Sequence, residues 1–219
     1  TALDPRTAFN RSVAPLSAAV ALGVVLIAVP VLLTALIAGE SNRPSIDFEG
    51  AGRGSLHPAL LLTLFAPDVY GATGRMGEFW GPPSVRWGET GLYLAQNMGQ
   101  LYLGALPVVL LIWGAVTGLL WQRGARLLTV AFVLSVVYAL GWYTPLFKPL
   151  HAFLPGVDLY RRPADAVFVI GFFGSVLAGF VLNEILSAPA PRLHRWQAGL
   201  LFAIPLAAFA AMLGLAYQL

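Results

Sequence analysis

Four stretches of the chain contain no acidic residue, no basic residue and no histidine, and they are close to the length that crosses a lipid bilayer. These stretches are Val13–Ala38, Leu101–Trp121, Ala166–Asn183 and Gln197–Leu219. A bilayer core of ~30 Å needs about 20 helical residues. Leu127–Tyr143 is a shorter fifth stretch. The sequence therefore predicts an all-α polytopic transmembrane helical bundle of about five spans, at 13–38, 101–121, 127–143, 166–186 and 197–219.

The composition supports a single membrane domain over residues 1–219. Charged residues make up only 11% of the chain and hydrophobic residues 58%, whereas a soluble domain is about a quarter charged. The basic residues are spread over the loops without a cluster, so nucleic-acid binding is not expected. The chain begins at Thr1 and stops within an apolar stretch at Leu219. We therefore expect it to be a piece of a longer protein.

Arginines in the short connecting segments predict the orientation of the chain. Short loops on the cytoplasmic side are enriched in Lys and Arg, whereas long loops translocate largely regardless of charge. The arginines that follow this pattern are Arg6, Arg11, Arg123, Arg126, Arg192 and Arg195. They place the N-terminus in the cytoplasm and two long loops, 39–100 and 144–165, on the outer side. Chemistry is expected in these loops.

The first outer loop is predicted to be structured rather than a simple linker. Ala59–Ala66 is apolar but too short to span, and Pro58 suits the first turn of a helix. We expect a short interfacial helix there. The following residues, 70–83, are rich in Gly, Trp and Pro, which is typical of irregular backbone.

Small residues recur at a spacing of four in two of the predicted spans. Gly114 and Gly118 form one pair, and Gly171, Ser175 and Gly179 form a series. Such spacing lets helix backbones approach closely in membranes. The pattern predicts helix packing rather than chemistry.

The predicted spans lack the groups that several membrane functions require. Ion-coupled transporters keep ionisable side chains inside the bilayer, and here the span interiors have none. His57, His151 and His194 lie far apart in loops, so neither a haem nor a zinc site is expected. No metal ligands and no cofactor are assigned, although the sequence leaves a divalent metal open.

Charged residues just before the fourth span form one candidate binding site. Arg161 and Arg162 are adjacent, and Asp158 and Asp165 flank them. Guanidinium groups bind phosphate oxygens bidentately, so the pair suits a lipid phosphate. The alternative is that these arginines pair with the two aspartates or with ordinary lipid headgroups.

The first outer loop offers a second set of candidates. Glu78, Glu89 and Asp68 are either acids, bases or acceptors for sugar hydroxyls, or simply solvated carboxylates. Trp80 and Trp87 either stack on a sugar ring or anchor the loop at the membrane interface. The sequence leaves both choices open.

Two blocks of residues resemble a family pattern. The first comprises Leu62–Gly71, Phe79–Pro82 and Leu101–Pro107, and the second comprises Leu154–Gly156 with Tyr160–Ala164. Together they resemble the YfhO-like bacterial membrane proteins of the GT-C glycosyltransferase group. Many relatives carry a second basic residue where this chain has Asp165. Either this branch handles a different substrate headgroup, or Asp165 holds Arg161 or Arg162 in place.

The resemblance implies the later part of a membrane glycosyltransferase in a bacterial inner (plasma) membrane. It implies a polyprenyl-phosphate sugar as donor and a cell-envelope glycan or lipid as acceptor. Arg161 and Arg162, with Asp165, would bind the phosphate end, and Glu78, Trp80 and Glu89 would line the sugar or acceptor pocket. The catalytic acidic residue is expected upstream of Thr1. The alternative is a non-catalytic transporter or flippase subunit, or a scaffold for envelope assembly.

Overall fold

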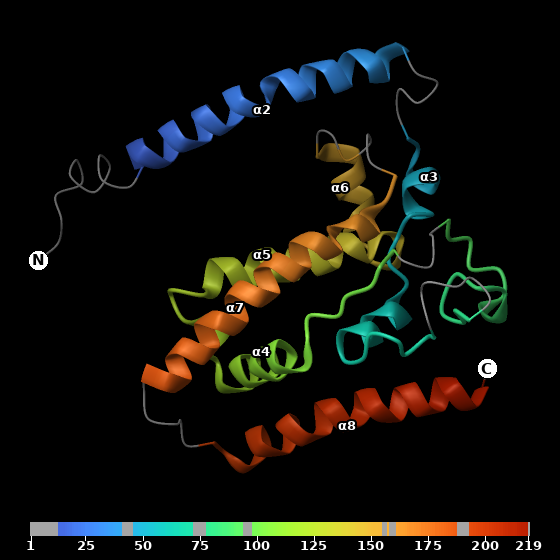
Figure 1. Ribbon diagram of the computed structural model, residues 1–219, viewed down its shortest axis with the longest axis vertical. Coiled ribbons are helices and arrows are strands. Elements are labelled where there is room, and N and C mark those ends of the chain that lie inside the picture. The colour runs from blue at the N-terminus through green and yellow to red at the C-terminus, as the bar shows by residue number, and fades with distance from the viewer. Residues whose placement is uncertain are drawn as a thin grey trace, which may run out of the picture. The chain divides into compact units, whose positions relative to one another are not determined.

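The computed structural model describes residues 13–40, 46–71, 78–93, 98–154, 157, 161–187 and 193–218. Within these ranges all regular elements are helices, and none is a strand. The chain divides into two compact units, residues 1–45 and residues 46–219. Each unit is described by itself, and Figure 1 labels the helices of both.

The first unit contains helix α2, Ala14–Glu40, which has 27 residues. At a rise of 1.5 Å per residue it is about 40 Å long, which exceeds the thickness of a bilayer core. Pro30 removes one backbone donor from this helix, and the Thr34 hydroxyl donates to the Pro30 carbonyl at 2.7 Å. The helix is apolar on all faces, as a membrane span is.

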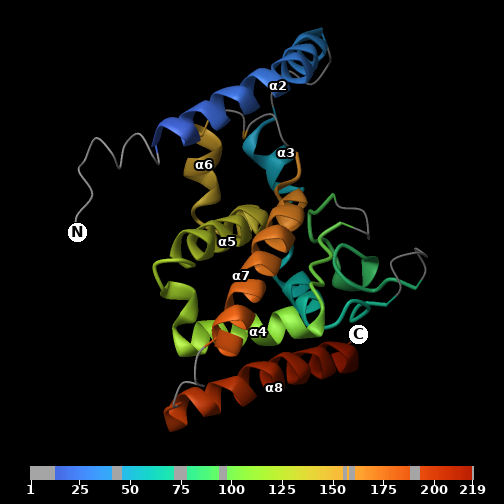
Figure 2. The ribbon, with the colours of Figure 1, turned by 60° about the vertical axis from the view of Figure 1, so that its left-hand side comes forward.

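The second unit is built on three helices (Figure 2): α4 (Ala105–Thr117), α5 (Arg126–Ala139) and α7 (Val167–Ser187). Helix α7 packs against both α4 and α5. Glycines allow their close approach. A Cβ added at Gly114 would lie 2.5 Å from Val181 Cγ2, and one at Gly174 would lie 2.7 Å from Leu103 Cδ1. The predicted packing role of Gly114 is therefore confirmed, whereas that of Gly179 is wrong for the described residues, because a Cβ there would meet nothing within 4 Å.

Helix α8, Arg195–Gln218, packs along α4. Its first turn is held by a glutamine that bonds in two directions. Gln197 Oε1 accepts from the His194 backbone N–H at 2.9 Å, and Gln197 Nε2 donates to the Val116 carbonyl at 2.8 Å. The second bond satisfies a carbonyl at the end of α4, where helix carbonyls lack partners within the helix. One side chain thus joins two helix ends.

The predicted helical membrane bundle is confirmed, but two of its five predicted spans are shorter than expected. The segments long and apolar enough to cross a membrane are Ala14–Thr34, Pro163–Ser187 and Arg195–Leu215. Helices α4 and α5 have 13 and 14 residues, which is about 20 Å each.

Glycines with positive φ explain the early ends of α4 and α5. Gly118, at φ 82°, ends α4 and is followed by the 3₁₀ turn η4 (Leu119–Trp121). Gly141, at φ 51°, begins the 3₁₀ turn η5 (Gly141–Tyr143) soon after α5. The left-handed backbone region is open mainly to glycine. Gly118 thus ends a helix rather than packing within one, and the apolar runs continue as 3₁₀ turns.

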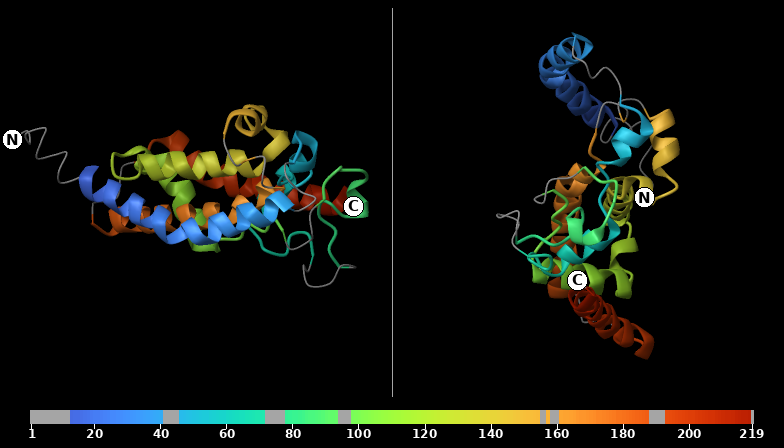
Figure 3. Two further views of the ribbon diagram at one scale, coloured as in Figure 1. Left: turned by 90° about the horizontal axis from the view of Figure 1, so that it is seen from above. Right: turned by 90° about the vertical axis from the view of Figure 1, so that its right-hand side faces the viewer.

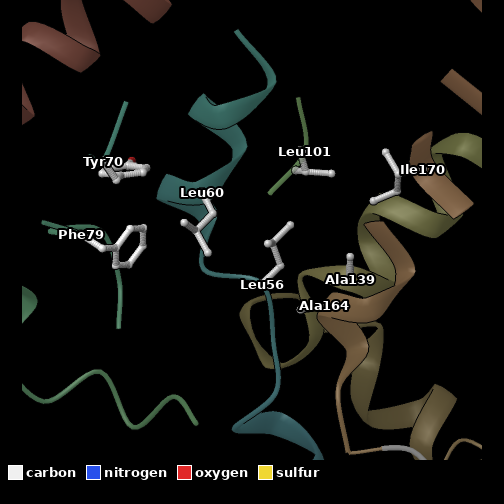
Figure 4. Close-up of a cluster of buried hydrophobic side chains, with 8 residues drawn as sticks. All are labelled: Leu56, Leu60, Tyr70, Phe79, Leu101, Ala139, Ala164 and Ile170. Atoms are coloured by element: carbon white, nitrogen blue, oxygen red, sulfur yellow. The ribbon is translucent and has the colours of Figure 1, made fainter. Parts of the chain in front are cut away.

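The first predicted outer loop folds onto one end of the bundle. It contains α3 (Phe48–Gly52) and two 3₁₀ helices, η2 (Pro58–Leu64) and η3 (Val85–Trp87). The predicted interfacial helix therefore exists as a 3₁₀ helix, and its depth in the membrane stays a prediction. Figure 4 shows the shared core of loop and bundle, formed by Leu56, Leu60, Tyr70, Phe79, Leu101, Ala139, Ala164 and Ile170.

The second predicted outer loop, 144–165, is largely helical. It contains α6 (Phe147–Phe153) and the 3₁₀ turn η7 (Pro163–Ala166), which runs directly into α7. Phe147 is fully buried and packs with Ala51. Figure 3 shows α3 and α6 at the same end of the second unit, opposite the α4–α5 connection. The two predicted outer loops thus share one end of the bundle.

Candidate functional site: a groove with a charged rim and a cluster of aromatic rings

An extended segment of the first loop holds the second loop in place. The Gly54 carbonyl accepts from the Ala164 N–H at 3.0 Å, and the Leu56 N–H donates to the Ala139 carbonyl at 2.8 Å. Ser55 Oγ accepts from the Trp142 N–H at 3.1 Å. Residues 54–56 are therefore bonded to the end of α5, to η5 and to η7. The backbone around Arg161 and Arg162 is fixed by this contact.

Gly54 permits this close approach because it has no side chain. A Cβ added there would overlap the Arg161 carbonyl oxygen and would lie 2.6 Å from Arg162 Cα. Real Cβ atoms do not come so close to backbone atoms, and backbone cannot move aside as a flexible side chain can. The predicted phosphate-binding arginines thus depend on a glycine that sequence reasoning did not select.

The side chains of Arg161, Arg162 and Asp165 are exposed. Arg162 Nη1 donates to the Met98 sulfur at 3.2 Å, and a thioether is a weak acceptor. Asp165 lies in the first turn of the apolar segment Pro163–Ser187, where the helix dipole favours a carboxylate. Among the described residues, no ion pair joins Asp165 to either arginine. Asp158 lies outside the described residues.

Arg162 and Asp165 lie at the edge of an apolar groove of about 840 Å³. Small-molecule pockets in proteins usually measure about 300–1,000 Å³. Helices α5, α6 and α7 form the walls, and the remaining lining residues are Leu134, Ser135, Val137, Tyr138, Leu146, Pro149, Leu150, Phe153, Leu154, Ala166 and Val169. The groove is therefore a hydrocarbon-lined cavity with one cation and one anion among its lining residues.

The other predicted site residues lie outside this groove. Glu78 and Glu89 are exposed, and Trp80 is half-buried. None of the three belongs to the groove lining. Trp80 is part of the folded loop. Its backbone N–H donates to the Tyr70 carbonyl at 2.9 Å, and its backbone carbonyl accepts from Trp87 Nε1 at 2.8 Å. The groove lining thus includes Arg162 and Asp165, but neither Arg161 nor any of the first-loop candidates.

Five rings at this end of the bundle make a continuous series of edge contacts, here called the ring cluster: His57, Tyr70, Trp80, Trp87 and Tyr143. Tyr70 contacts Trp80 with ring centroids 5.0 Å apart and Trp87 at 6.1 Å. His57 lies 5.2 Å from Trp87 and 5.2 Å from Tyr143. Edge-to-face pairs at these distances stabilise by about 0.5–1.5 kcal/mol each. The cluster joins η2 and η3 to η5.

Two hydrogen bonds to Ala59 fix the polar atoms of the cluster. The Tyr70 hydroxyl donates to the Ala59 carbonyl at 2.6 Å, and His57 Nδ1 accepts from the Ala59 N–H at 3.2 Å. His57 is thereby the N-cap of η2. Sequence reasoning placed His57 at a helix start and excluded it as a haem or zinc ligand, but assigned it no cap. Its position directly before the Pro at the helix start was the signal for a capping role.

Burial shifts the pKa values of His57 and Tyr70 in the ring cluster. Desolvation lowers the pKa of His57 below its usual 6.5, because a partly buried imidazolium is less well hydrated than a neutral imidazole. The same cause raises the pKa of Tyr70 to about 12. Both side chains are therefore neutral at pH 7. Because Nδ1 accepts a hydrogen bond, the imidazole proton is on Nε2.

Within the part of the chain that the structure describes, no group of three or more His, Asp or Glu side chains is arranged to hold a metal ion. Comparison with known proteins finds no matching family, no matching curated protein and no matching solved structure.

Proposed function

We propose that this chain is the substrate-holding part of a membrane glycosyltransferase that uses a polyprenyl-phosphate sugar as donor. The acceptor in this proposal is a cell-envelope glycan or lipid at the outer face of a bacterial plasma membrane. One observation carries it: Arg162 stands at the edge of a hydrocarbon-lined groove of about 840 Å³. A groove of this composition suits an isoprenoid chain, and a guanidinium beside it suits the phosphate.

The weak hydrogen-bond partner of the Arg162 side chain leaves its guanidinium group available to bind a phosphate. Its side-chain hydrogen bond goes to the sulfur of Met98, which a phosphate oxygen would replace with a much stronger, charge-assisted bond. Arg161 is exposed on the preceding residue. The two guanidinium groups would stabilise the negative charge that develops on the phosphate when the sugar leaves.

The first-loop residues take the sugar or acceptor side in this proposal. Trp80 is held by backbone bonds in the ring cluster, and Glu78 and Glu89 are exposed on the same loop. The loop that carries them is attached to the same end of the bundle as Arg162, because its residues 54–56 bond to the end of α5, to η5 and to η7. The catalytic acid is not assigned to any of these residues.

Arginine replacement tests the phosphate site. Arg161→Ala combined with Arg162→Ala should abolish binding of a polyprenyl monophosphate to the chain in lipid nanodiscs, measured by native mass spectrometry. Arg123→Ala is the matched control, because Arg123 is exposed and precedes α5 at the opposite end from the groove. Unchanged binding by the double variant would refute the phosphate role.

The same variants separate the enzyme from a non-catalytic lipid-binding subunit. In the native full-length protein, the double variant should lose sugar transfer to the acceptor while its insertion into the membrane is unaltered. A wild-type protein that binds the polyprenyl phosphate but transfers no sugar from any polyprenyl-phosphate donor would favour the flippase or scaffold instead.

A further inference from the structure

The His57 ring contains a polar group that the hydrogen bonds within the ring cluster leave unused. His57 Nδ1 accepts from the Ala59 N–H, so the Nε2 atom carries the proton. Among the described residues, this N–H has no hydrogen-bond partner. The atom is not enclosed, since His57 is half-buried and Nε2 is not among the buried side-chain atoms that lack a partner. A fixed, accessible donor therefore remains available.

Rings from two distant parts of the chain contact the ring that carries this donor. Trp87, from the first loop, meets the His57 ring at an interplanar angle of 70°, and Tyr143, after α5, meets it at 75°. Trp87 is half-buried and Tyr143 is 38% exposed, so both offer ring surface to a ligand. A neutral donor between aromatic rings is suited to a ligand with hydroxyl groups and an apolar C–H face.

We propose that His57, Trp87 and Tyr143 form a hexose-binding subsite, in which His57 Nε2–H donates to a sugar hydroxyl beside the two rings. This inference rests on the proposed function, for which it identifies the group that contacts the sugar. The subsite takes a neutral hydroxyl rather than a phosphate, because a neutral imidazole supplies one donor and no charge. The arginines at the groove supply the charge.

Two replacements of His57 separate its cap from its free donor. His57→Asn keeps an acceptor near the Nδ1 position, and Asn is among the best N-cap residues, but it removes the distal donor. His57→Gln places an amide N–H near the Nε2 position. Both variants lose the edge contacts of the His57 ring with Trp87 and Tyr143. A purely structural role therefore predicts equal glycoside binding by the two variants, whereas a donor role predicts stronger binding by His57→Gln.

Methyl glycosides of glucose, galactose, mannose and N-acetylglucosamine are the probes, measured by saturation-transfer NMR with the full chain in lipid nanodiscs. We expect at least one to bind the wild type, and His57→Asn to weaken that binding about three- to tenfold, as loss of one hydrogen bond does. His57→Gln should retain part of the binding. His194→Asn is the control, since His194 is exposed and precedes α8.

The outcomes that overturn the inference are distinct. Failure of all four glycosides to bind the wild type removes the subsite. Wild-type binding by His57→Asn, or equally weak binding by His57→Asn and His57→Gln, would show that His57 has a structural role only. Because the probes carry neither lipid nor phosphate, these outcomes are independent of the polyprenyl monophosphate test. Failure of that test removes the phosphate site and leaves the glycoside result standing.

Discussion

The groove and the ring cluster lie at the same end of the bundle, but their polar groups are held in different ways. In the groove, the Arg162 side chain donates to a sulfur atom and to no other acceptor within the described part of the chain, and Asp165 is exposed. In the ring cluster, Tyr70 and His57 each bond to Ala59 backbone atoms at 2.6 and 3.2 Å. Charge at the groove is therefore left for a ligand to neutralise, whereas the ring cluster is largely satisfied without one. A bound ligand should therefore stabilise the groove more than the ring cluster.

The largest effect is expected from Gly54→Ala, which adds a side chain against the backbone of Arg161 and Arg162. The added Cβ would overlap the Arg161 carbonyl, and such overpacking costs about 1–3 kcal/mol. We expect a lower Tm and weaker binding of polyprenyl monophosphate, because Arg161 and Arg162 move with their backbone. Thermal unfolding in detergent and native mass spectrometry measure the two effects.

Gly179→Ala is the control for this substitution. A Cβ at Gly179 in α7 meets nothing within 4 Å, so the helix should gain up to about 1 kcal/mol in stability. If Gly54→Ala behaved like Gly179→Ala, the close approach of residue 54 to the arginine backbone would be disproved.

The next effect tests the groove alone. Leu150→Trp adds a large ring to the groove wall on α6, and we expect binding of polyprenyl monophosphate to weaken at least about tenfold, or ~1.4 kcal/mol. Glycoside binding at the ring cluster should not change. Leu186→Trp, on the exposed surface of α7, should leave both unchanged. Equal binding by the two tryptophan variants would show that the lipid chain does not occupy the groove.

A smaller effect is confined to the ring cluster. Tyr70→Phe keeps the buried ring but removes the hydroxyl that donates to the Ala59 carbonyl at 2.6 Å. We expect the free energy of unfolding to fall by about 1 kcal/mol, while binding of polyprenyl monophosphate is unaltered. An unchanged Tm would mean that this hydrogen bond contributes no net stability.

The smallest effect is a pH dependence of the ring cluster. The folded-state pKa of His57 lies below its unfolded value of 6.5. Below pH 6.5 the unfolded state therefore binds more protons than the folded state, and the free energy of unfolding decreases as the pH is lowered. The contribution of neutral His57 is complete above pH 6.5 and is lost as pH falls through the lowered pKa. Tm measured at pH 7.5 and pH 5 should decrease less for His57→Asn than for the wild type. Identical decreases in Tm for the two proteins would refute a lowered pKa of His57.

The helices could be predicted where composition alone decides them. The predicted spans 166–186 and 197–219 correspond closely to α7 (Val167–Ser187) and α8 (Arg195–Gln218). The predicted helix at Ala59–Ala66 appears as η2 (Pro58–Leu64), so its existence was predictable and its 3₁₀ geometry was not. The second loop was not predicted to contain α6, because seven residues with a central Pro149 give too short a pattern to distinguish from a loop.

The candidate site was predictable only in part. Arg162 and Asp165 are three residues apart at a helix start, so their proximity followed from local sequence. Their position at a groove did not, because the walls come from α5, α6 and α7. His57 was passed over as a functional residue because its neighbours Trp87 and Tyr143 are 30 and 86 residues away in the chain.

The sequence by itself determined that this chain forms apolar helices, because a residue in a bilayer must satisfy its backbone within its own segment and keep charge out of the core. Those requirements are local and can be judged from composition. Only the tertiary structure decided how Gly54 supports the arginine pair and which rings contact His57. These features depend on contacts between segments far apart in the chain, which no local pattern encodes.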